Sequence, residues 1–568
     1  MQNDFPVIDR LGQLLGQIRL YEGVTIEKLA DGLCSTSLLG RIEAGEREID
    51  QQLADTFFQR LGKPAELYER ILDEDEFQSW QTRQKIIQSL NNGDFAAAGA
   101  IAKEYCASSS EVLDHQFCAI VEINCCAAEG ADAIRLFPMV SSALKLTQPK
   151  LDRGGIANML LVALRIIEND YAAGRYASAL VLCENLLEDL TREKSLLAYA
   201  ELLEWKQRLH DAMGNPDRTP EKLLCHLKNI MAYAPEQQKL LIPCEESGNI
   251  YCLNDVLRTR RILLGLSQEE LAADICATNT LSRVENHRCN LQKRNRRTLL
   301  QRVNMSGERY DYEVVTDRYE DYILRSELDR MIKRGDMEKA QELFELLRRR
   351  TPDTLTNRQY INNKSASLRF RLPAGHPDKI SVAEYAQQLK DAIRLTLPLD
   401  FDDIGAWKPC VLAINEMLCL LSFANCCERL GKLEECLSIL DYIRRCLGCS
   451  CKDGTLYVDL YTRVQIGIAS VLGSMKRYRE SSTRVQECLA LLIQNQRSDL
   501  LPWCLLGEAW NIFHQKDDIK QKTQICTDET VVEMFRRAYA ASMIAGDVVR
   551  QRSVLRHCRK RCGIEPEL

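Results

Sequence analysis

Apolar residues recur along most of the chain at intervals of three and four residues, which is the spacing of a helix with one buried face. No segment shows a convincing alternation of apolar and polar residues, the pattern of a half-buried strand. Proline and glycine gather at 214–216 and 373–377, and a further proline stands at 398, so we interpret these segments as loops. The pattern therefore predicts an all-α fold.

The helical pattern of the first 62 residues returns later in the chain. Residues 11–62 align without a gap on residues 253–304, at a constant shift of 242 positions. The same shift carries Gly93 and Asp94 onto Gly335 and Asp336. We interpret this as a tandem duplication whose first unit ends near residue 245. The residues that recur in the second copy are Leu11, Leu15, Arg19, Gly23, Glu27, Leu29, Ala30, Cys34, Thr36, Leu39, Arg41, Glu43, Thr56, Gln59 and Arg60.

Local signals divide the second copy into short helices. Residues 253–264 form one amphipathic helix, which Gly265 ends because glycine adopts a left-handed conformation at little cost. Ser267 and Glu270 have the spacing of a capping box, so a second helix is expected from there to about residue 275. A turn precedes a third helix at 278–285, on which Leu281 and Val284 are expected to face inward.

The strings LSQEELAADICATNTLSRVEN (266–286) and VTIEKLADGLCSTSLLGRIEAG (24–45) resemble the lambda-repressor-like, or XRE-type, helix-turn-helix family. The resemblance implies that the third helix enters the major groove of double-stranded DNA and that its first residues reach base edges. The base readers implied in this way are Thr278, Asn279 and Ser282, with Gln268 near the DNA backbone. Thr280 and Arg283 complete this face, and the matching candidates in the first copy are Thr36, Ser37 and Arg41.

Charge separates the two copies, although the whole chain has a net charge of only −6. Residues 253–304 hold ten Lys or Arg and five acids, whereas residues 11–62 hold five basic and eight acidic residues. Basic side chains just after a recognition helix commonly meet phosphates. We therefore expect the second copy to bind DNA better, and the first to act as a docking module if it has lost DNA binding. The basic cluster after the third helix is Arg288, Lys293, Arg294, Arg296 and Arg297.

The segments behind each helix-turn-helix show a recurrent break between helices. Gly93, Gly174, Gly335 and Gly431 each precede a large residue by two positions and a small residue by five. This resembles tetratricopeptide repeats, which stack into solenoids with a concave binding face. A helix-turn-helix joined to such repeats is similar to the RNPP group of peptide-sensing regulators from Gram-positive bacteria. The resemblance implies that the repeats bind a short peptide or protein effector, or mediate homodimerisation. Asn158 and Asn415 could then clamp a peptide backbone, although lone asparagines on helices are more often solvated.

The predicted domains are a helix-turn-helix at 1–66, helical repeats at 67–245, a basic helix-turn-helix at 246–308 and further repeats at 309–568. The leading interpretation is a sequence-specific DNA-binding transcription regulator. One variant is a homodimer fused into one chain, whose two helix-turn-helices read two half-sites. The alternative is an interaction scaffold with vestigial helix-turn-helix modules, which would have no need of the basic residues around 288–297.

The chemistry of an enzyme is not evident in the sequence. We find no phosphate-binding loop, no nucleophile–histidine arrangement and no paired carboxylates, and therefore expect neither catalysis nor a cofactor. The absence of a signal peptide or long apolar run favours the cytoplasm, without membrane contact. The chain has 24 cysteines, mostly within helical patterns, which are expected to be small buried hydrophobes. Cys446, Cys449 and Cys451, with Cys410 or Cys436, form a candidate metal or redox site, but free placement of cysteines elsewhere favours a structural role. His557, Cys558 and Cys562 form a weaker candidate of the same kind.

Overall fold

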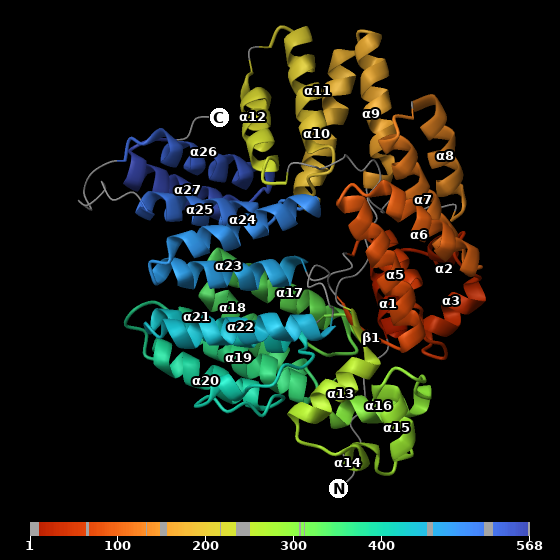
Figure 1. The fold of residues 1–568 in the computed structure, drawn as a ribbon, viewed down its shortest axis with the longest axis vertical. Helices are drawn as coiled ribbons and strands as arrows, with labels where there is room; N and C mark the ends of the chain where they lie inside the picture. Colours follow the sequence, from red (N-terminus) through yellow and green to blue (C-terminus); the bar gives the residue numbers. More distant parts are fainter. Residues whose placement is uncertain are drawn as a thin grey trace. The chain divides into compact units, whose positions relative to one another are not determined.

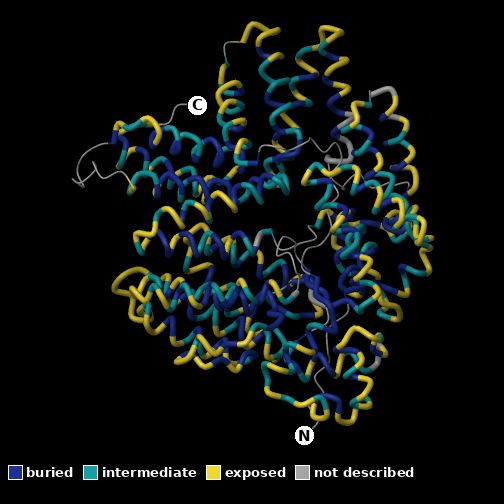
Figure 2. Tube along the Cα trace, in the orientation of Figure 1, coloured by how far each residue is buried: buried dark blue, intermediate teal, exposed yellow. Residues whose placement is uncertain are grey.

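A computed structural model shows a chain built almost entirely of helices, α1 to α27 (Figure 1). It describes residues 11–63, 68–131, 133–147, 156–215, 217–234, 250–305, 308–311, 313–450, 458–515 and 526–565. The predicted all-α fold is confirmed for these residues. Buried positions run along one side of most helices (Figure 2), in keeping with the three- and four-residue spacing of the apolar pattern.

One small sheet was not predicted. Its strands are β1 (Glu69–Leu72), β2 (Ile250–Cys252) and β3 (Glu308–Arg309), in the order β2-β1-β3. β1 is parallel to β2, with Arg70 opposite Ile250, and antiparallel to β3. All four residues of β1 are buried, and its sequence, Glu-Arg-Ile-Leu, does not alternate between apolar and polar residues. A strand this short and covered on both faces leaves no period-two signal in the sequence.

The chain forms two compact units that do not follow its order. The first consists of Met1–Gln81 and Glu246–Tyr457, and the second of Thr82–Glu245 and Val458–Leu568. Each unit therefore takes segments from both halves of the sequence. The boundaries at 66, 245 and 308 predicted from the sequence stay predictions.

The first unit contains both predicted helix-turn-helix segments. The first segment consists of α1 (Leu11–Tyr21), α2 (Ile26–Ala30), α3 (Thr36–Glu43) and α4 (Gln51–Arg60). The second consists of α13 (Leu253–Leu263), α14 (Gln268–Ala272), α15 (Thr278–Glu285) and α16 (Lys293–Arg302). Every helix of the second segment begins and ends 242 positions after its counterpart.

The same ion pair closes both segments. Arg19 binds Glu43 at 2.6 Å in the first, and Arg261 binds Glu285 at 2.6 Å in the second. The predicted capping box is present, since Ser267 Oγ accepts from the Glu270 amide while the Glu270 carboxylate accepts from the Ser267 amide. The predicted end of the second helix near residue 275 is wrong. The helix stops at Ala272, because the next residue is extended and Asp274 has a φ of +59°.

Six further helices of the first unit pack against one another in chain order. They are α17 (Tyr319–Arg334), α18 (Met337–Arg350), α19 (Leu355–Arg371), α20 (Val382–Arg394), α21 (Ile414–Arg429) and α22 (Leu433–Ser450). The predicted breaks are present: Gly335 and Gly431 have φ values of +82° and +76°. Ala340 and Cys436, the small residues five positions later, are buried, as a close helix approach requires.

The described elements of the second unit are helices, apart from one isolated β-bridge between Ser195 and Arg497. Its first part holds α6 (Phe95–Ser108), α7 (Val112–Ala128), α8 (Ala133–Lys145), α9 (Ile156–Ala172), α10 (Tyr176–Glu193), α11 (Tyr199–Ala212) and α12 (Thr219–Met231). Its second part holds α23 (Val458–Ser474), α24 (Tyr478–Gln494), α25 (Leu501–Gln515), α26 (Glu529–Ile544) and α27 (Val548–His557). α5 (Glu74–Asn91) begins in the first unit and ends in the second. One hydrophobic core includes side chains from both parts of the second unit.

The two parts of the second unit meet through equivalent residues. α9, α10 and α11 begin 302 positions before α23, α24 and α25. The Leu196 amide donates to the Gln496 carbonyl at 2.7 Å, and the Ser498 amide donates to the Lys194 carbonyl at 2.8 Å. Residues 194 and 196 correspond to 496 and 498 at this shift, so the two hydrogen bonds are reciprocal. Equivalent residues of the two parts therefore bond to each other.

The number of positions between corresponding helices changes along the chain, which shows that the second half contains an additional pair of helices. The shift is 242 positions at α6 and α18 but 302 at α9 and α23. The second half of the chain is therefore longer by 60 residues in this interval, which contains α21 and α22.

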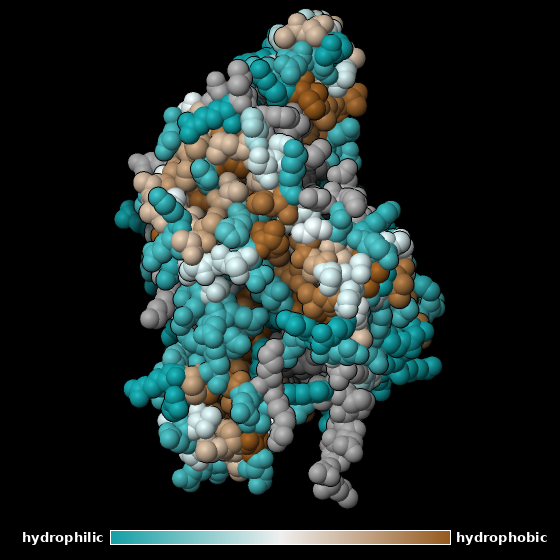
Figure 3. All heavy atoms as spheres, turned by 90° about the vertical axis from the view of Figure 1, so that its right-hand side faces the viewer, coloured by the Kyte–Doolittle hydropathy of each residue, from teal (hydrophilic) through white to brown (hydrophobic). Residues whose placement is uncertain are grey.

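Hydrophilic and hydrophobic residues are interspersed on the face of the molecule drawn in Figure 3. Large exposed apolar side chains include Leu20 and Tyr21 on α1 and Val548 and Val549 on α27. Among the described helices, none is long and apolar enough to span a bilayer.

Helix capping differs between the two copies and gives a first prediction. Ser35 Oγ caps α3 by accepting from the Leu38 amide at 3.1 Å, whereas Ala277 precedes α15 with the same extended backbone and offers no side-chain acceptor. We expect Ala277→Ser to stabilise α15 by about 1 kcal/mol and Ser35→Ala to destabilise α3 by a similar amount. Hydrogen exchange of residues 278–285 and 36–43 would then slow in the first variant and quicken in the second. Unchanged exchange in Ala277→Ser would contradict this account.

Candidate nucleic-acid interface

Helix α15 presents a polar face beside a buried one. Leu281 and Val284 have no exposed surface and fix the helix in its domain, as expected. Asn279, Thr280 and Arg283 are exposed. The other two candidates on this helix, Thr278 and Ser282, are half-buried. The small polar side chains proposed from the sequence therefore lie on one helix, with three of the five candidates exposed.

Gln268 has a structural contact that the sequence did not indicate. Its side-chain amide donates to Glu285 Oε2 at 2.7 Å. Glu285 is itself buried and binds the guanidinium of Arg261, whose Nη1 also donates to the Leu266 carbonyl at 2.9 Å. Gln268 thus helps to fasten the start of α14 to the end of α15.

Part of the positive charge counted in the second copy is used inside the protein. Arg302 Nη1 donates to the carbonyl oxygens of Leu271 and Ala273 at 3.0 and 2.5 Å. Arg261 is engaged by Glu285, and Arg260 has no exposed surface. The excess of basic over acidic residues in the sequence therefore overstates the charge that a ligand meets.

The basic residues after α15 are differently placed. Arg288 and Arg297 are exposed, and Arg296 is half-buried. The side chains of Lys293 and Arg294 lie outside the described residues, although α16 begins at Lys293. Arg288 follows the third helix by three residues, so its charge stands close to the polar face of α15.

The first copy offers a different surface. Thr36, Ser37 and Arg41 are all exposed on α3, where the sequence placed them. Arg41 faces Glu46 at 3.7 Å, so an acid partly neutralises the one cation of this helix. Asp50 Oδ1 caps α4 by accepting from the Leu53 amide at 2.8 Å.

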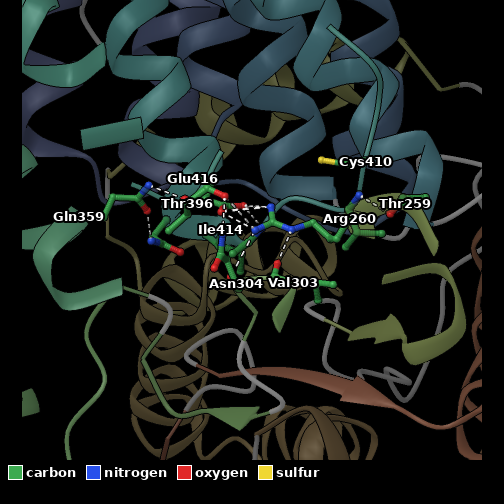
Figure 4. A network of polar contacts seen from close by, with 12 residues as sticks. Thr259, Arg260, Val303, Asn304, Gln359, Thr396, Cys410, Ile414 and Glu416 are labelled. Carbon is green, nitrogen blue, oxygen red and sulfur yellow. Dashed lines mark hydrogen bonds and ion pairs between the residues drawn. The ribbon is translucent and has the colours of Figure 1, made fainter. Parts of the chain in front are cut away.

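A buried polar network joins the second helix-turn-helix to the repeats (Figure 4). The Arg260 guanidinium on α13 donates to both carboxylate oxygens of Glu416 on α21, at 3.0 to 3.2 Å. Its Nε donates to the Val303 carbonyl at 3.1 Å, just after α16, and its Nη2 to the Thr396 carbonyl at 3.4 Å, just after α20. Both charged side chains are almost completely inaccessible to solvent. One guanidinium thereby joins four segments.

Further hydrogen bonds extend this network. Glu416 Oε2 accepts from the Ala413 amide at 2.9 Å, and Thr259 Oγ1 accepts from the Val411 amide at 3.1 Å. Glu69 Oε1 on β1 accepts from the Ile414 amide at 3.3 Å, so the strand that follows the first helix-turn-helix reaches the same segment. The side-chain amide of Asn415 donates to Gln359 in the repeat core. Asn415 is buried there, away from any exposed peptide-binding face, and the side chain of Asn158 lies outside the described residues.

The cysteines proposed as metal ligands are only partly described. Cys446 is buried and lies close to the buried Cys410, whereas Cys451 lies outside the described residues. Burial raises the pKa of the half-buried Cys449 thiol to about 11, and its Sγ donates to the Arg445 carbonyl. Within the described part of the chain, a different group brings three ligand side chains within metal-binding distance: Glu74, Cys252 and His287. The sequence contains no sign of this group, because its members are up to 213 positions apart.

Comparison with known proteins gives a remote likeness only. No family model matches the chain. No curated protein matches it either. Among solved structures, PlcR of Bacillus thuringiensis in complex with the peptide PapR7 and DNA is 13% identical, with a TM-score of 0.34 over 53% of this chain and 98% of that one. ComR of Streptococcus vestibularis is 14% identical, with a TM-score of 0.28 over 54% and 96%. The SHP pheromone receptor Rgg2 of Streptococcus dysgalactiae is 15% identical, with a TM-score of 0.28 over 54% and 99%. What this chain binds therefore has to be argued from its own residues.

The Arg260–Glu416 pair gives a second prediction. In Arg260→Met the Glu416 carboxylate stays buried without its cation, so we expect the free energy of unfolding of the first unit to fall by about 3–5 kcal/mol. The double variant Arg260→Met/Glu416→Leu should recover most of that loss, since an apolar pair of similar volume needs no buried charge. Urea unfolding followed by circular dichroism, with hydrogen exchange at α13 and α21, measures both. A double variant less stable than the single one would show that the pair is not held by its charges.

Proposed function

We propose that this protein is a sequence-specific DNA-binding transcription regulator that reads its site with α15. The observation that carries the proposal is the coincidence, on one short helix, of a polar exposed face with a cation directly beyond its end. Asn279 and Thr280 supply the face, and Arg288 supplies the cation. A helix of this kind in a helix-turn-helix fits the major groove.

The roles of the residues follow from their chemistry. The Asn279 amide can donate and accept in one plane, which suits adenine, and such a contact contributes about 1–3 kcal/mol of discrimination. Thr278, Thr280 and Ser282 offer hydroxyls that can adapt to several bases. Arg283, Arg288 and Arg297 are the candidates for phosphate contacts, which provide affinity without sequence information. Lys293 and Arg294 join this set on sequence grounds alone.

The first helix-turn-helix is a weaker candidate for DNA binding. Its helix α3 carries Gly40 where α15 has Ser282, and Glu46 where the second copy has Arg288. Like charge near a phosphate opposes binding. We propose that this copy serves as a docking module. The repeats are the candidate site for a peptide or protein effector, as the resemblance to peptide-sensing regulators implies.

A single chain is also proposed to act as its own dimer. The reciprocal hydrogen bonds around Ser195 and Arg497 support this, because equivalent residues pair as they would across a two-fold axis. α12 and α26 pack against each other in the same unit, with His226 and Glu533 3.4 Å apart. A tandem duplication would produce this arrangement by fusing two subunits.

Selection from random DNA duplexes across a salt series is the direct test of DNA binding. We expect the full chain to enrich one sequence, with affinity that falls as salt rises. Arg288→Ala and Arg297→Ala should weaken binding to all sequences, and each should reduce the salt slope by about 1 if its arginine binds one phosphate. Asn279→Ala should instead relax preference at one base position.

Arg47→Ala is the matched control, since Arg47 is exposed in the first copy. It should leave binding nearly unchanged. If Arg47→Ala lost as much affinity as Arg288→Ala, the first copy would be shown to contact DNA as well. Enrichment of no sequence, with no salt-dependent binding in the presence or absence of cell-derived peptides, would favour the interaction scaffold.

The self-dimer proposal predicts the mass of the protein in solution. We expect light scattering to give the mass of one chain at micromolar concentration, because the surface that two subunits would share is already occupied within the chain. Leu196→Pro removes the amide that donates to Gln496, so exchange of the reciprocal Ser498 amide should quicken in that variant. A stable dimer of whole chains would overturn the proposal.

A further inference from the structure

Three ligand side chains from separate elements converge beside the recognition helix. Glu74 begins α5, Cys252 ends β2 and His287 lies in the turn after α15. Glu74 Oε2 is 2.6 Å from His287 Nδ1 and 3.3 Å from Cys252 Sγ. The ligand atoms of all three lie within 4.8 Å of one another. All belong to the first compact unit.

A fourth side chain, Asp255, contacts the ring of His287 on the side away from Glu74. The other ring nitrogen of His287, Nε2, lies 3.3 Å from Asp255 Oδ1 on α13. A carboxylate that accepts the far N–H of a ligating histidine fixes its ring and tautomer, an arrangement common at zinc centres. Asn290 braces the same turn, since its side chain accepts from the Glu74 amide at 3.1 Å and donates to Asp75 at 2.6 Å.

The donor set and spacing fit one kind of ion. A thiolate, an imidazole and a carboxylate suit Zn²⁺, whose bonds to them are about 2.3, 2.0 and 2.0 Å. Tetrahedral angles then put ligand atoms about 3.3–3.6 Å apart. Cys252 and Glu74 already have that separation, and Glu74 and His287 need to part by less than about 1 Å.

We propose that Glu74, Cys252 and His287 bind Zn²⁺, with water in the fourth position and Asp255 positioning His287. On binding, the Cys252 thiol loses its proton to solvent, and Nδ1 of neutral His287 donates its lone pair to the metal while Nε2–H is held by Asp255. The oxidation state of no atom changes.

Within the described residues the site occurs once, although the helices around it occur twice. Position 287 corresponds to Gly45 in the first copy, and both residues have a positive φ, +57° and +73°. Glycine adopts this conformation readily, whereas a histidine there carries backbone strain. Asp255 corresponds to Gln13, Cys252 to Arg10 and Glu74 to Thr316, so none of the four side chains has a counterpart of the same type.

The position of the site suggests what the metal controls. Arg288 follows His287 directly, and β2 leads from Cys252 into α13. Zinc would clamp the turn that carries Arg288 to α5 and β2. This step rests on the proposed DNA binding: zinc should then raise affinity for DNA by holding that turn in one conformation.

The test uses the full chain, reduced and freed of metal by a chelator. Co²⁺ is titrated as a spectroscopic substitute for Zn²⁺, followed by displacement with Zn²⁺. We expect one equivalent to give tetrahedral d–d bands and a thiolate charge-transfer band, and Zn²⁺ to abolish both. Cys252→Ser should lose the charge-transfer band, and His287→Ala should lose stoichiometric binding. Asp255→Asn should weaken binding about 10–100-fold.

Cys276→Ser and Cys449→Ser are the controls for cobalt binding by other cysteines of the chain. Both should leave the cobalt spectrum unchanged. Because His287 lies in a partly exposed turn, His287→Ala should fold, and circular dichroism checks this. No cobalt bands in the folded wild-type chain, or bands lost in Cys449→Ser but kept in His287→Ala, would overturn the proposal. Cobalt binding as expected, without any DNA binding, would leave the metal site standing and refute the proposed function.

Discussion

The buried ion pair between Arg260 and Glu416 is the constraint on which the arrangement of the second helix-turn-helix depends. A buried arginine needs an acid to balance its charge and acceptors for its five N–H donors. Arg260 has the acid on α21 and further acceptors in the carbonyl groups that follow α16 and α20. Glu416 lies in the stretch by which the second half of the chain is longer. The first copy has Ile18, fully buried, at the position of Arg260. The extra helices and the buried cation therefore belong to one structural difference between the two copies.

That difference extends to the chemistry of the surfaces. The two copies share helix bounds and the Arg–Glu pair that closes each domain, yet the second replaces Gly40 by Ser282, Glu46 by Arg288 and Gly45 by His287. None of these positions is buried, and the helix bounds are the same with either set of residues. A scaffold that is stable with either set of residues lets one copy acquire charge and ligands without loss of fold. The shared fold of the two copies therefore does not imply a shared function.

The features predicted from sequence were those whose cause is local. The capping box at Ser267, the inward positions of Leu281 and Val284, and the left-handed glycine at 265 each follow from residues within one or two helical turns. From the sequence, Arg260 counts with the basic residues available to a ligand. Its buried partner Glu416 is 156 positions away, so the sequence alone did not reveal the ion pair. The strand β1 and the Glu74–His287 contact were missed for the same reason. Contacts between distant segments leave no periodic trace, and a single sequence does not reveal them.

The buried pair also limits how an effector could act on DNA binding. Separating α13 from α21 would expose or isolate two charges, which costs several kcal/mol, whereas an effector typically shifts an equilibrium by about 1–3 kcal/mol. Under the proposed function, a signal received by the repeats is therefore better transmitted by moving α13 together with α21 than by releasing it. This network does not include α15 or the turn at His287, which has its own contacts with Glu74 and Asp255. A ligand that fixes this turn could alter DNA affinity while Arg260 and Glu416 remain paired.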